Sequence, residues 1–282
     1  RKHRPKTLDE LVGQDEAVKV LKAMSAAKEI PHCLLIVGDS GVGKTSIARI
    51  LRKELGCHQA DFVEINCAQD AGIDKVKEVQ RMSTKHPLMG PCRVFYWDEV
   101  QSLSRAGFSQ QAALKMLEDV PDHVWHILAT TDPTKLHKAI LTRCVRLDLK
   151  PIKQPALVSL LKRVCKAESI QAGDDVLGRI AEVAEGSARD ALQVLERVAR
   201  LPDKERLEAV VKSGVKKQAF DLVRLMVWQK GKWEDARKIL VDIEGTESEQ
   251  FRQLVLACAV KEMAKEGGNA ARGFLVLEAF GR

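Results

Sequence analysis

The sequence has no apolar run near the roughly 20 residues that a membrane-spanning helix needs, and no signal peptide is visible. Its seven cysteines are scattered singly, without a CxxC pair. This distribution argues against a dense disulfide framework and predicts reduced thiols in a cytoplasmic protein. Aromatic residues make up only 4% of the chain and are not interleaved with basic residues. Stacking on nucleic-acid bases is therefore not the expected mode of any nucleic-acid contact.

What is present is a basic composition that fits a soluble protein. The 282 residues are 45% hydrophobic and 30% charged, which is typical of a globular chain of one to three domains. The formal net charge is +7. A basic balance favours a polyanionic partner, but the signal is weak because many ordinary proteins carry a few excess lysines.

Apolar segments suited to buried strands alternate with helical patterns through about residue 150. The expected strands are residues 33–37, 61–66, 92–100, 124–130 and 143–149. The expected helices between them are residues 44–56, 72–84 and 107–120. Alternation of this kind predicts a parallel, three-layer α/β domain.

The strand pattern stops after residue 150. Residues 156–200 contain three helical segments, and residues 203–282 are helical with breaks at glycine-containing stretches. The sequence therefore predicts an α/β domain followed by two all-helical pieces. The predicted boundaries are 1–150, 151–202 and 203–282.

A glycine-rich loop follows the first expected strand. Residues 38–45, GDSGVGKT, satisfy the GxxxxGK[ST] pattern, with a strand before them and a helix after them. The backbone N–H groups of such a loop cradle phosphates, its lysine reaches the β and γ phosphates, and its hydroxyl binds Mg²⁺. The expected nucleotide-binding residues are Gly38, Asp39, Ser40, Gly41, Val42, Gly43, Lys44, Thr45 and Ser46.

An acidic pair, Asp98 and Glu99, ends the apolar strand that contains VFYW. Ligands of open α/β sheets bind beyond the carboxyl ends of the strands, so the pair is expected beside the phosphate loop. Asp98 would bind Mg²⁺ together with Thr45. Glu99 would orient and deprotonate a water for in-line attack on the γ-phosphate. A solvated acidic pair at a strand end is the simpler alternative.

Several segments, in order, resemble AAA+ sliding-clamp-loader ATPases. They are RKHRPKTLDELVGQDEAVKVL, GDSGVGKTSIAR, EINCAQDAGIDKVKEV, the block from FYWDEVQSLS to LTRC, and EGSARDAL. Bacterial DNA polymerase III gamma/tau subunits resemble the chain most, replication factor C small subunits next, and the likeness covers about residues 1–200. It implies an α/β AAA+ (P-loop NTPase) domain with a parallel sheet, followed by a small helical lid domain and a C-terminal all-helical collar domain.

The resemblance assigns further residues to the ATPase site. Thr131 in ATTDP matches sensor 1, which contacts the γ-phosphate or the attacking water. Arg143 in LTRC matches the arginine finger, which acts in trans on nucleotide bound to the neighbouring subunit. Arg189 in GSARDAL matches sensor 2, which reaches the bound phosphates from a lid helix. The simpler alternatives are a turn-forming threonine, a solvated arginine and a helix start capped by Ser187.

The resemblance also implies the ligands, ATP and Mg²⁺. The segment expected around the adenine contains Arg4, Pro5, Val12 and Gly13, with His3 where the family usually has an aromatic residue. The bacterial subunits carry a four-cysteine zinc module between the phosphate loop and the acidic strand. Because this interval contains only the two cysteines Cys57 and Cys67, no zinc is predicted.

The partners that the resemblance implies are the other subunits of a pentameric ring, a sliding clamp and primer-template DNA, with no membrane. The ring would hold several copies of this chain and at least one different subunit, in the cytoplasm at the replisome. Tracking of DNA phosphates needs positive charge and backbone N–H groups at helix starts. The candidate DNA contacts, for which a solvated basic face is the alternative, are Lys75, Lys77, Arg105, Gly107 and Ser109.

Three other functions remain as alternatives. A Holliday-junction branch-migration helicase has a similar N-terminal segment, but it would end in a winged-helix domain with strand signals. Residues 203–282 show no clear alternating strand pattern, which argues against this function. A non-hydrolysing scaffold subunit of the same ring tends to have a damaged phosphate loop, and this loop is intact. A small-molecule P-loop kinase would explain neither Arg143 nor the helical tail.

Overall fold

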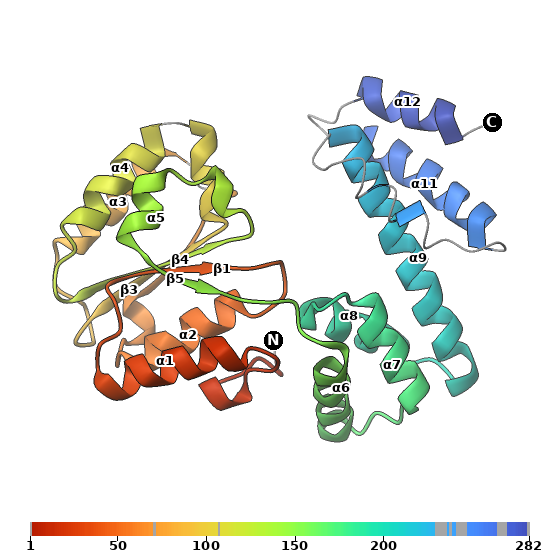
Figure 1. Ribbon diagram of the computed structural model, residues 1–282, viewed down its shortest axis with the longest axis horizontal. Helices are drawn as coiled ribbons and strands as arrows, with labels where there is room; N and C mark the ends of the chain where they lie inside the picture. Colours follow the sequence, from red (N-terminus) through yellow and green to blue (C-terminus); the bar gives the residue numbers. More distant parts are fainter. Residues whose placement is uncertain are drawn as a thin grey trace. The chain divides into compact units, whose positions relative to one another are not determined.

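The computed structural model describes residues 2–69, 72–106, 108–228, 236, 239–240, 247–263 and 270–280. The chain divides into two compact units (Figure 1). The first comprises residues 1–170 and 184–193, and the second comprises residues 171–183 and 194–282.

A five-stranded sheet forms the centre of the first unit. The strands follow the order β2-β3-β4-β1-β5 and all run parallel, which confirms the predicted α/β domain. Successive residues of β1 point to opposite faces, since Leu34 and Ile36 belong to one apolar core and Leu35 and Val37 to the other. The strands are β1 Cys33–Val37, β2 Phe62–Asn66, β3 Arg93–Asp98, β4 Val124–Thr130 and β5 Val145–Asp148.

Helices cover both faces of this sheet and complete the three layers (Figure 1). The α-helices of the unit are α1 Asp15–Ala27, α2 Lys44–Glu54, α3 Ile73–Ser83, α4 Phe108–Glu118, α5 Lys138–Arg143, α6 Gln154–Glu168 and the start of α8 Ala188–Val198. The short 3-10 helices are η1 Leu8–Glu10, η2 Gln59–Asp61, η3 Val100–Ala106 and η4 Pro133–Lys135. Leu21 of α1 and Ile47 of α2 enter one core, whereas Val76 of α3 and Ile140 of α5 enter the other.

Two predicted strands are shorter in the structure. The strand predicted over residues 92–100 is β3, which ends at Asp98, and Val100 lies in η3 instead. The pattern predicts a strand over residues 143–149, but α5 ends at Arg143 and β5 begins at Val145. His137 gives the physical reason, because its Nδ1 accepts a hydrogen bond from Ala139 N at 3.2 Å and caps the first turn of α5. Arg143 therefore lies at the end of a helix.

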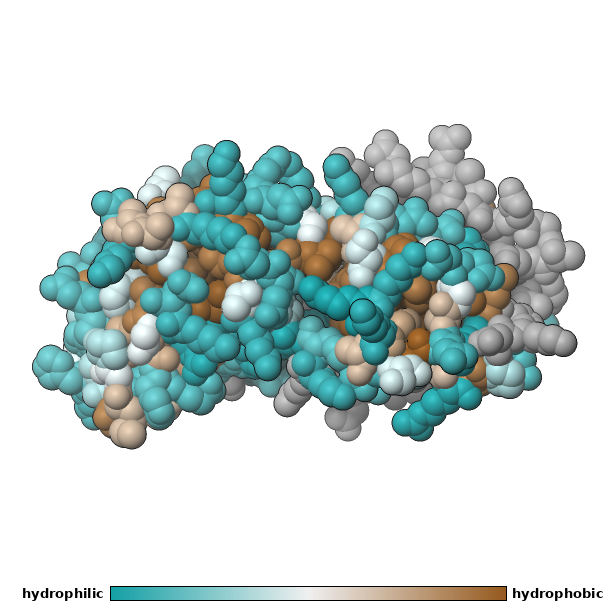
Figure 2. Space-filling model, turned by 90° about the horizontal axis from the view of Figure 1, so that it is seen from below, coloured by the Kyte–Doolittle hydropathy of each residue, from teal (hydrophilic) through white to brown (hydrophobic). Residues whose placement is uncertain are grey.

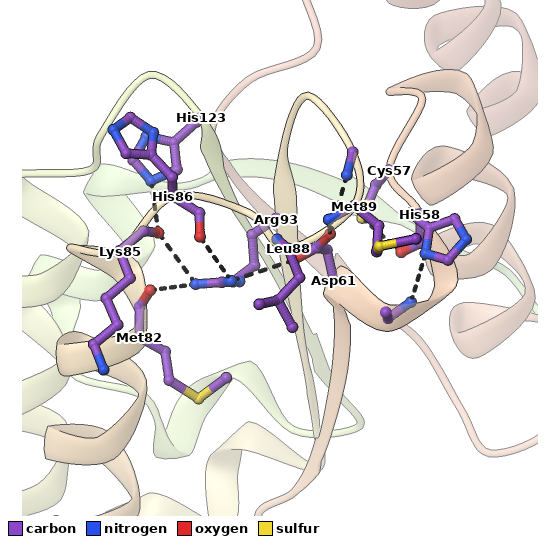
Figure 3. Close-up of polar contacts among 12 residues, drawn as sticks. Cys57, His58, Asp61, Met82, Lys85, His86, Leu88, Met89, Arg93 and His123 are labelled. Atoms are coloured by element: carbon purple, nitrogen blue, oxygen red, sulfur yellow. Dashed lines mark hydrogen bonds and ion pairs between the residues drawn. The ribbon is translucent and has the colours of Figure 1, made fainter.

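A buried ion pair closes the amino ends of β2 and β3 (Figure 3). Asp61 and Arg93 are 0% and 4% exposed, and Arg93 Nη2 lies 3.3 Å from Asp61 Oδ1. The carboxylate also accepts hydrogen bonds from the backbone N–H groups of Leu88, Met89 and Gly90, at 2.6, 2.8 and 3.2 Å. Burial alone would raise the pKa of Asp61, but these donors and Arg93 hold it below its usual value.

The guanidinium of Arg93 binds the other side of the same loop. It donates to the carbonyl oxygens of Met82, Lys85 and His86, the last two at 3.2 and 3.1 Å (Figure 3). The side chains of Leu88 and Met89 meanwhile remain largely exposed. The ion pair and its hydrogen bonds therefore hold the backbone of residues 82–90 in place.

Among its described residues, the second unit contains helices joined by turns and irregular segments, and no strands. Its core contains Val223 and Val227 of α9, Phe251 and Val255 of α11, and Val276 of α12. The helices are α7 Asp174–Val183, the end of α8, α9 Asp203–Trp228, α11 Glu247–Met263 and α12 Ala270–Phe280. Helical structure after residue 150 agrees with the sequence, while the division into a lid at 151–202 and a collar at 203–282 stays a prediction.

Figure 2 shows one face on which hydrophilic residues predominate and apolar residues are visible between them. Within the described ranges, no helix is long and apolar enough to cross a membrane. All seven cysteines are free thiols, and only Cys258 is not buried.

Candidate nucleotide site

The phosphate loop joins the carboxyl end of β1 to the start of α2. Gly41 and Gly43 have φ angles of +80° and +122°, a region that favours glycine. A Cβ at Gly41 would also lie 2.1 Å from Ser187 Oγ, so no larger residue fits there without a shift. These glycines give the loop the curvature of an anion cradle at the positive end of α2.

Lys44 lies inside this loop. Its side chain is buried, and Nζ donates to the carbonyl oxygens of Gly38 and Asp39 at 2.7 and 2.9 Å. Burial lowers the pKa of Lys44, and the nearby carboxylates of Glu99 and Asp98 oppose that effect. The ammonium group of Lys44 therefore lies within the predicted phosphate-binding loop.

The side chains of Thr45 and Asp98, the two predicted magnesium ligands, both contact the hydroxyl of Tyr96. Thr45 Oγ1 is 3.1 Å from Tyr96 Oη, which donates to Asp98 Oδ1 at 3.0 Å. Burial, followed by the Asp98 charge, raises the pKa of Tyr96, so the phenol stays protonated as a donor. A hydroxyl and a carboxylate this near to each other are the hard oxygen ligands that Mg²⁺ prefers, so the residues fit the implied ion.

Tyr96 is not among the site residues that the sequence predicts. The signal was nevertheless present, because Tyr96 and Asp98 are two residues apart on β3 and therefore share a face of the sheet.

Glu99 directly follows β3 in a strained backbone conformation. Its φ is +53°, which costs an ordinary residue on the order of 1 kcal/mol. Its backbone N–H donates to Asp98 Oδ1 at 3.2 Å. A strained acidic residue that directly follows a strand ending beside the phosphate loop is typical of a functional position.

Thr131 and Gln101 contact the Glu99 carboxylate. Thr131 Oγ1, just beyond β4, donates to Glu99 Oε2 at 3.4 Å. Gln101 Nε2 donates to the same Oε2 and to Thr131 Oγ1, the latter at 3.0 Å. The structure therefore brings together Glu99 and Thr131, which the sequence predicted separately, through a glutamine that it did not single out.

Arg189 approaches the phosphate loop from the start of α8. Its Nη1 donates to Ser40 Oγ at 3.4 Å. Ser187 caps the same helix, since its Oγ accepts from Asp190 N at 3.2 Å. The helix cap by Ser187, which was the simpler explanation of this motif, is therefore present. It also orients α8, the helix that carries Arg189, toward the phosphate loop.

The N-terminal segment belongs to the first unit, and Arg4, Pro5 and Val12 are each partly buried in it. His3 Nε2 lies 2.5 Å from Glu168 Oε1, so the residue in the aromatic position has a local polar partner. Gln14 is buried and donates to Val42 O at 3.3 Å and to Lys150 O at 2.7 Å. The sequence did not predict it as a site residue. Gln14 ties the phosphate loop to the end of the sheet.

Arg143 lies at the opposite edge of the sheet. It precedes the amino end of β5, whereas the phosphate loop follows the carboxyl end of the parallel β1. A strand the length of β1 spans about 16 Å. The guanidinium donates to Ala139 O at 3.0 Å and pairs with Glu118 of α4. The structure thus separates Arg143 from the phosphate loop of its own chain.

The predicted DNA contacts fall partly within the described residues. Lys75 and Lys77 lie in the first turns of α3, which begins beyond the carboxyl end of β2. Lys77 is exposed, and Lys75 Nζ forms an ion pair with Glu78 at 2.9 Å. Gly107 and the side chains of Arg105 and Ser109 lie outside the described residues.

The part of the chain that the structure describes has no group of three or more His, Cys, Asp or Glu side chains suited to a metal ion. Cys57 and Cys67, the cysteines of the interval considered for zinc, are both buried free thiols. The absence of zinc stays a prediction.

Comparisons with known proteins agree with this geometry. Residues 34–151 match the family described as "ATPase family associated with various cellular activities (AAA)". The chain is 33% identical over 217 residues to DNA polymerase III subunit tau of Bacillus subtilis (strain 168), covering 70% of this chain and 38% of that protein. It is 33% identical over 256 residues to the tau subunit of Escherichia coli (strain K12), covering 82% and 40%. The chain belongs to the AAA+ ATPases of the gamma/tau type.

This gamma/tau-type chain spans less than two thirds of the length of the curated relatives it matches. The share is 38% and 40% for the two tau subunits, and 61% for DNA polymerase III subunit gamma of Buchnera aphidicola subsp. Schizaphis graminum, at 32% identity over 222 residues. Its fold is also similar to the Thermotoga maritima RuvB Holliday junction branch migration motor, with a TM-score of 0.63 over 82% of each chain. Because the identity to that motor is 21%, the likeness shows the AAA+ fold alone.

Proposed function

We propose that this gamma/tau-type ATPase is the ATP-hydrolysing subunit of a DNA sliding-clamp loader. The observation that carries the proposal is the split site. Lys44 and Glu99 lie at the carboxyl edge of the sheet, and Arg143 lies at the amino edge of the same sheet. A subunit arranged in this way hydrolyses ATP efficiently only when a neighbour supplies the arginine.

The residues of the carboxyl edge have distinct roles in this proposal. The glycine loop and Lys44 bind the ATP phosphates, and Arg189 reaches them from α8. Thr45 and Asp98 would hold Mg²⁺, which would neutralise charge on the phosphates when bound. Glu99 takes the proton of the attacking water, and its neighbour Thr131 orients that water or the γ-phosphate.

The proposed partners are those of the clamp loaders that the chain resembles. The names of the relatives contribute DNA polymerase III, and the net charge of +7 favours a polyanion such as DNA. Several copies of this chain, with at least one different subunit, would form a pentameric ring around primer-template DNA at the replisome. ATP binding would favour a spiral that opens the sliding clamp and holds the DNA, and hydrolysis would release both. Lys75 and Lys77 would meet DNA phosphates at the start of α3.

The test is the ATPase rate of the ring, purified with its partner subunits, with and without primed DNA and clamp. We expect stimulation when both are present. In the stimulated ring, Arg143→Ala lowers kcat by about 10³-fold or more, the effect of a lost arginine finger. Mixing Arg143→Ala chains with Glu99→Gln chains restores activity above either variant alone, since some interfaces then combine an intact Glu99 with an intact Arg143.

Three results would overturn the proposal. A parent ring without stimulation by primed DNA and clamp would remove the clamp-loader assignment. Junction unwinding by the ring without a clamp would favour the branch-migration alternative. Equal, negligible turnover of the parent and Glu99→Gln would favour a scaffold subunit.

A further inference from the structure

We propose that Gln101 is a positioning residue that holds Glu99 and Thr131 in their relative places for hydrolysis. This inference rests on the proposed function, because it assigns a role within the same ATPase site. Gln101 lies in η3, the first turn after β3, and its side chain is partly buried. One amide there contacts residues that come from two neighbouring strands.

The hydrogen bonds of Gln101 use both ends of its amide. Nε2 donates to Glu99 Oε2, and also to Thr131 Oγ1 at 3.0 Å. Oε1 accepts from Thr130 Oγ1 at 2.7 Å. A primary amide offers two N–H donors and a carbonyl acceptor in one plane, and each part is engaged here.

The orientation of the amide follows from its neighbours. The hydroxyl of buried Thr130 accepts from Asp132 N at 3.0 Å, so its own hydrogen is available for an acceptor. That acceptor must be the carbonyl oxygen of Gln101. At the other end the Glu99 carboxylate can only accept, so it requires the NH₂ group. Both ends therefore select the same orientation.

This arrangement supports a residue whose backbone is strained. Glu99 has a φ of +53°, and among the described residues the other hydrogen-bond donor to its carboxylate is Thr131, at 3.4 Å. Among the described residues, both donors reach Oε2, and Oε1 carries no hydrogen bond. Gln101 therefore fixes one oxygen of the carboxylate and leaves the other for the attacking water. The same amide ties Thr131 to that oxygen, so a displacement of Thr131 by the γ-phosphate is transmitted to Glu99.

The test compares Gln101→Met with the parent chain in the ring purified with its partner subunits. Methionine keeps the length and volume of the side chain but removes every hydrogen bond. We expect kcat to fall about 10- to 100-fold, the cost of a small misplacement of a catalytic group, with the KM and the dissociation constant for ATP changed less than threefold. Gln101→His, which keeps one donor and one acceptor, should recover part of the loss. Gln111→Met, at an exposed glutamine of α4, is the matched control and should leave kcat unchanged.

A purely structural role predicts a different result. If Gln101→Met had the parent kcat, or if the Met and His variants lost activity equally with weakened ATP binding, the positioning role would be wrong. Comparing basal and stimulated rates separates this inference from the proposed function. Clamp and DNA could fail to stimulate the parent while Gln101→Met still lowers the basal kcat. That result would contradict only the clamp-loader assignment. A parent with no turnover under any condition would overturn both.

Discussion

The two edges of the same sheet use acidic residues in opposite ways. At the amino edge, Asp61 is fully buried, and an arginine and three backbone N–H groups bind its carboxylate. At the carboxyl edge, Asp98 and Glu99 are partly exposed, and Glu99 has a strained backbone. The amino edge is closed, and the carboxyl edge has a carboxylate oxygen available to a ligand or water.

The difference shows that residue type alone does not separate stability from chemistry. Both edges contain a carboxylate near a cation, Asp61 with Arg93 and Glu99 near Lys44. A satisfied, buried pair is costly to break and has no capacity left for substrate. Among the described residues, the hydrogen bonds to the Glu99 carboxylate reach only one of its two oxygens, so Glu99 can still bind substrate or water. The following predictions test this contrast, beginning with the largest effect.

The first prediction concerns the carboxyl edge. In the stimulated ring, Glu99→Gln should lower the ATPase kcat by about 10²- to 10⁴-fold, because the general base is lost while size and shape are kept. ATP binding and the midpoint of thermal unfolding should stay close to those of the parent. Asp148→Asn, which removes an exposed carboxylate paired with Arg146, is the control and should leave kcat unchanged. Unfolding at a much lower temperature would mean that Glu99 serves the fold.

The second prediction concerns the amino edge. Asp61→Ala should lower the free energy of unfolding by about 3–5 kcal/mol at pH 7, because it leaves Arg93 buried without its carboxylate. Urea denaturation measures this loss. The double variant Leu88→Ser/Met89→Ser changes exposed side chains of the same loop and should shift stability by less than about 0.5 kcal/mol. Equal effects of the two changes would contradict the distinction between the buried pair and the loop surface.

The third prediction concerns His126 in the middle of β4. Burial lowers its pKa to about 3, and Trp97 Nε1 donates to its Nδ1 at 3.2 Å. In the unfolded chain a histidine has a pKa of about 6.5, so below that pH the unfolded state binds more protons and stability falls. Between pH 7.5 and pH 5 this residue should account for a loss of about 2 kcal/mol in the free energy of unfolding.

Urea denaturation across that pH range provides the measurement. His126→Gln keeps an acceptor for Trp97 and should remove this part of the pH dependence. His86→Gln, at an exposed histidine, should leave the dependence as it is in the parent. An unchanged slope for His126→Gln would show that other groups are responsible.

Much of the first unit could be predicted from local sequence patterns. The alternation of apolar runs with helical periodicity predicts the parallel sheet. The segment GDSGVGKT and the pair Asp98 and Glu99 predict which residues lie at its carboxyl edge. The helix α5 was missed because its start depends on a side-chain cap from His137, which resembles an ordinary loop residue in sequence. The domain boundaries, the trans role of Arg143 and the DNA contacts stay predictions.

Other residues could not be found from the sequence because their partners are remote. Gln14 bonds to Val42 and Lys150, and Asp61 pairs with Arg93 across 32 positions of chain. Gln101 contacts Thr131 only because β3 and β4 are neighbours in the sheet. No local periodicity marks such residues, since each is a single polar side chain in a turn or at a strand end.

The sequence by itself determined the elements, the phosphate loop and the acidic pair, because these depend on backbone conformation and spacing over a few residues. The tertiary structure decided which polar groups meet. Strand order placed Thr131 beside Glu99, and the parallel direction of β1 and β5 placed Arg143 at the far edge from its own phosphate loop. Hydrogen bonds act over about 3 Å, so these contacts exist only after distant segments have been brought together by the burial of the apolar strands.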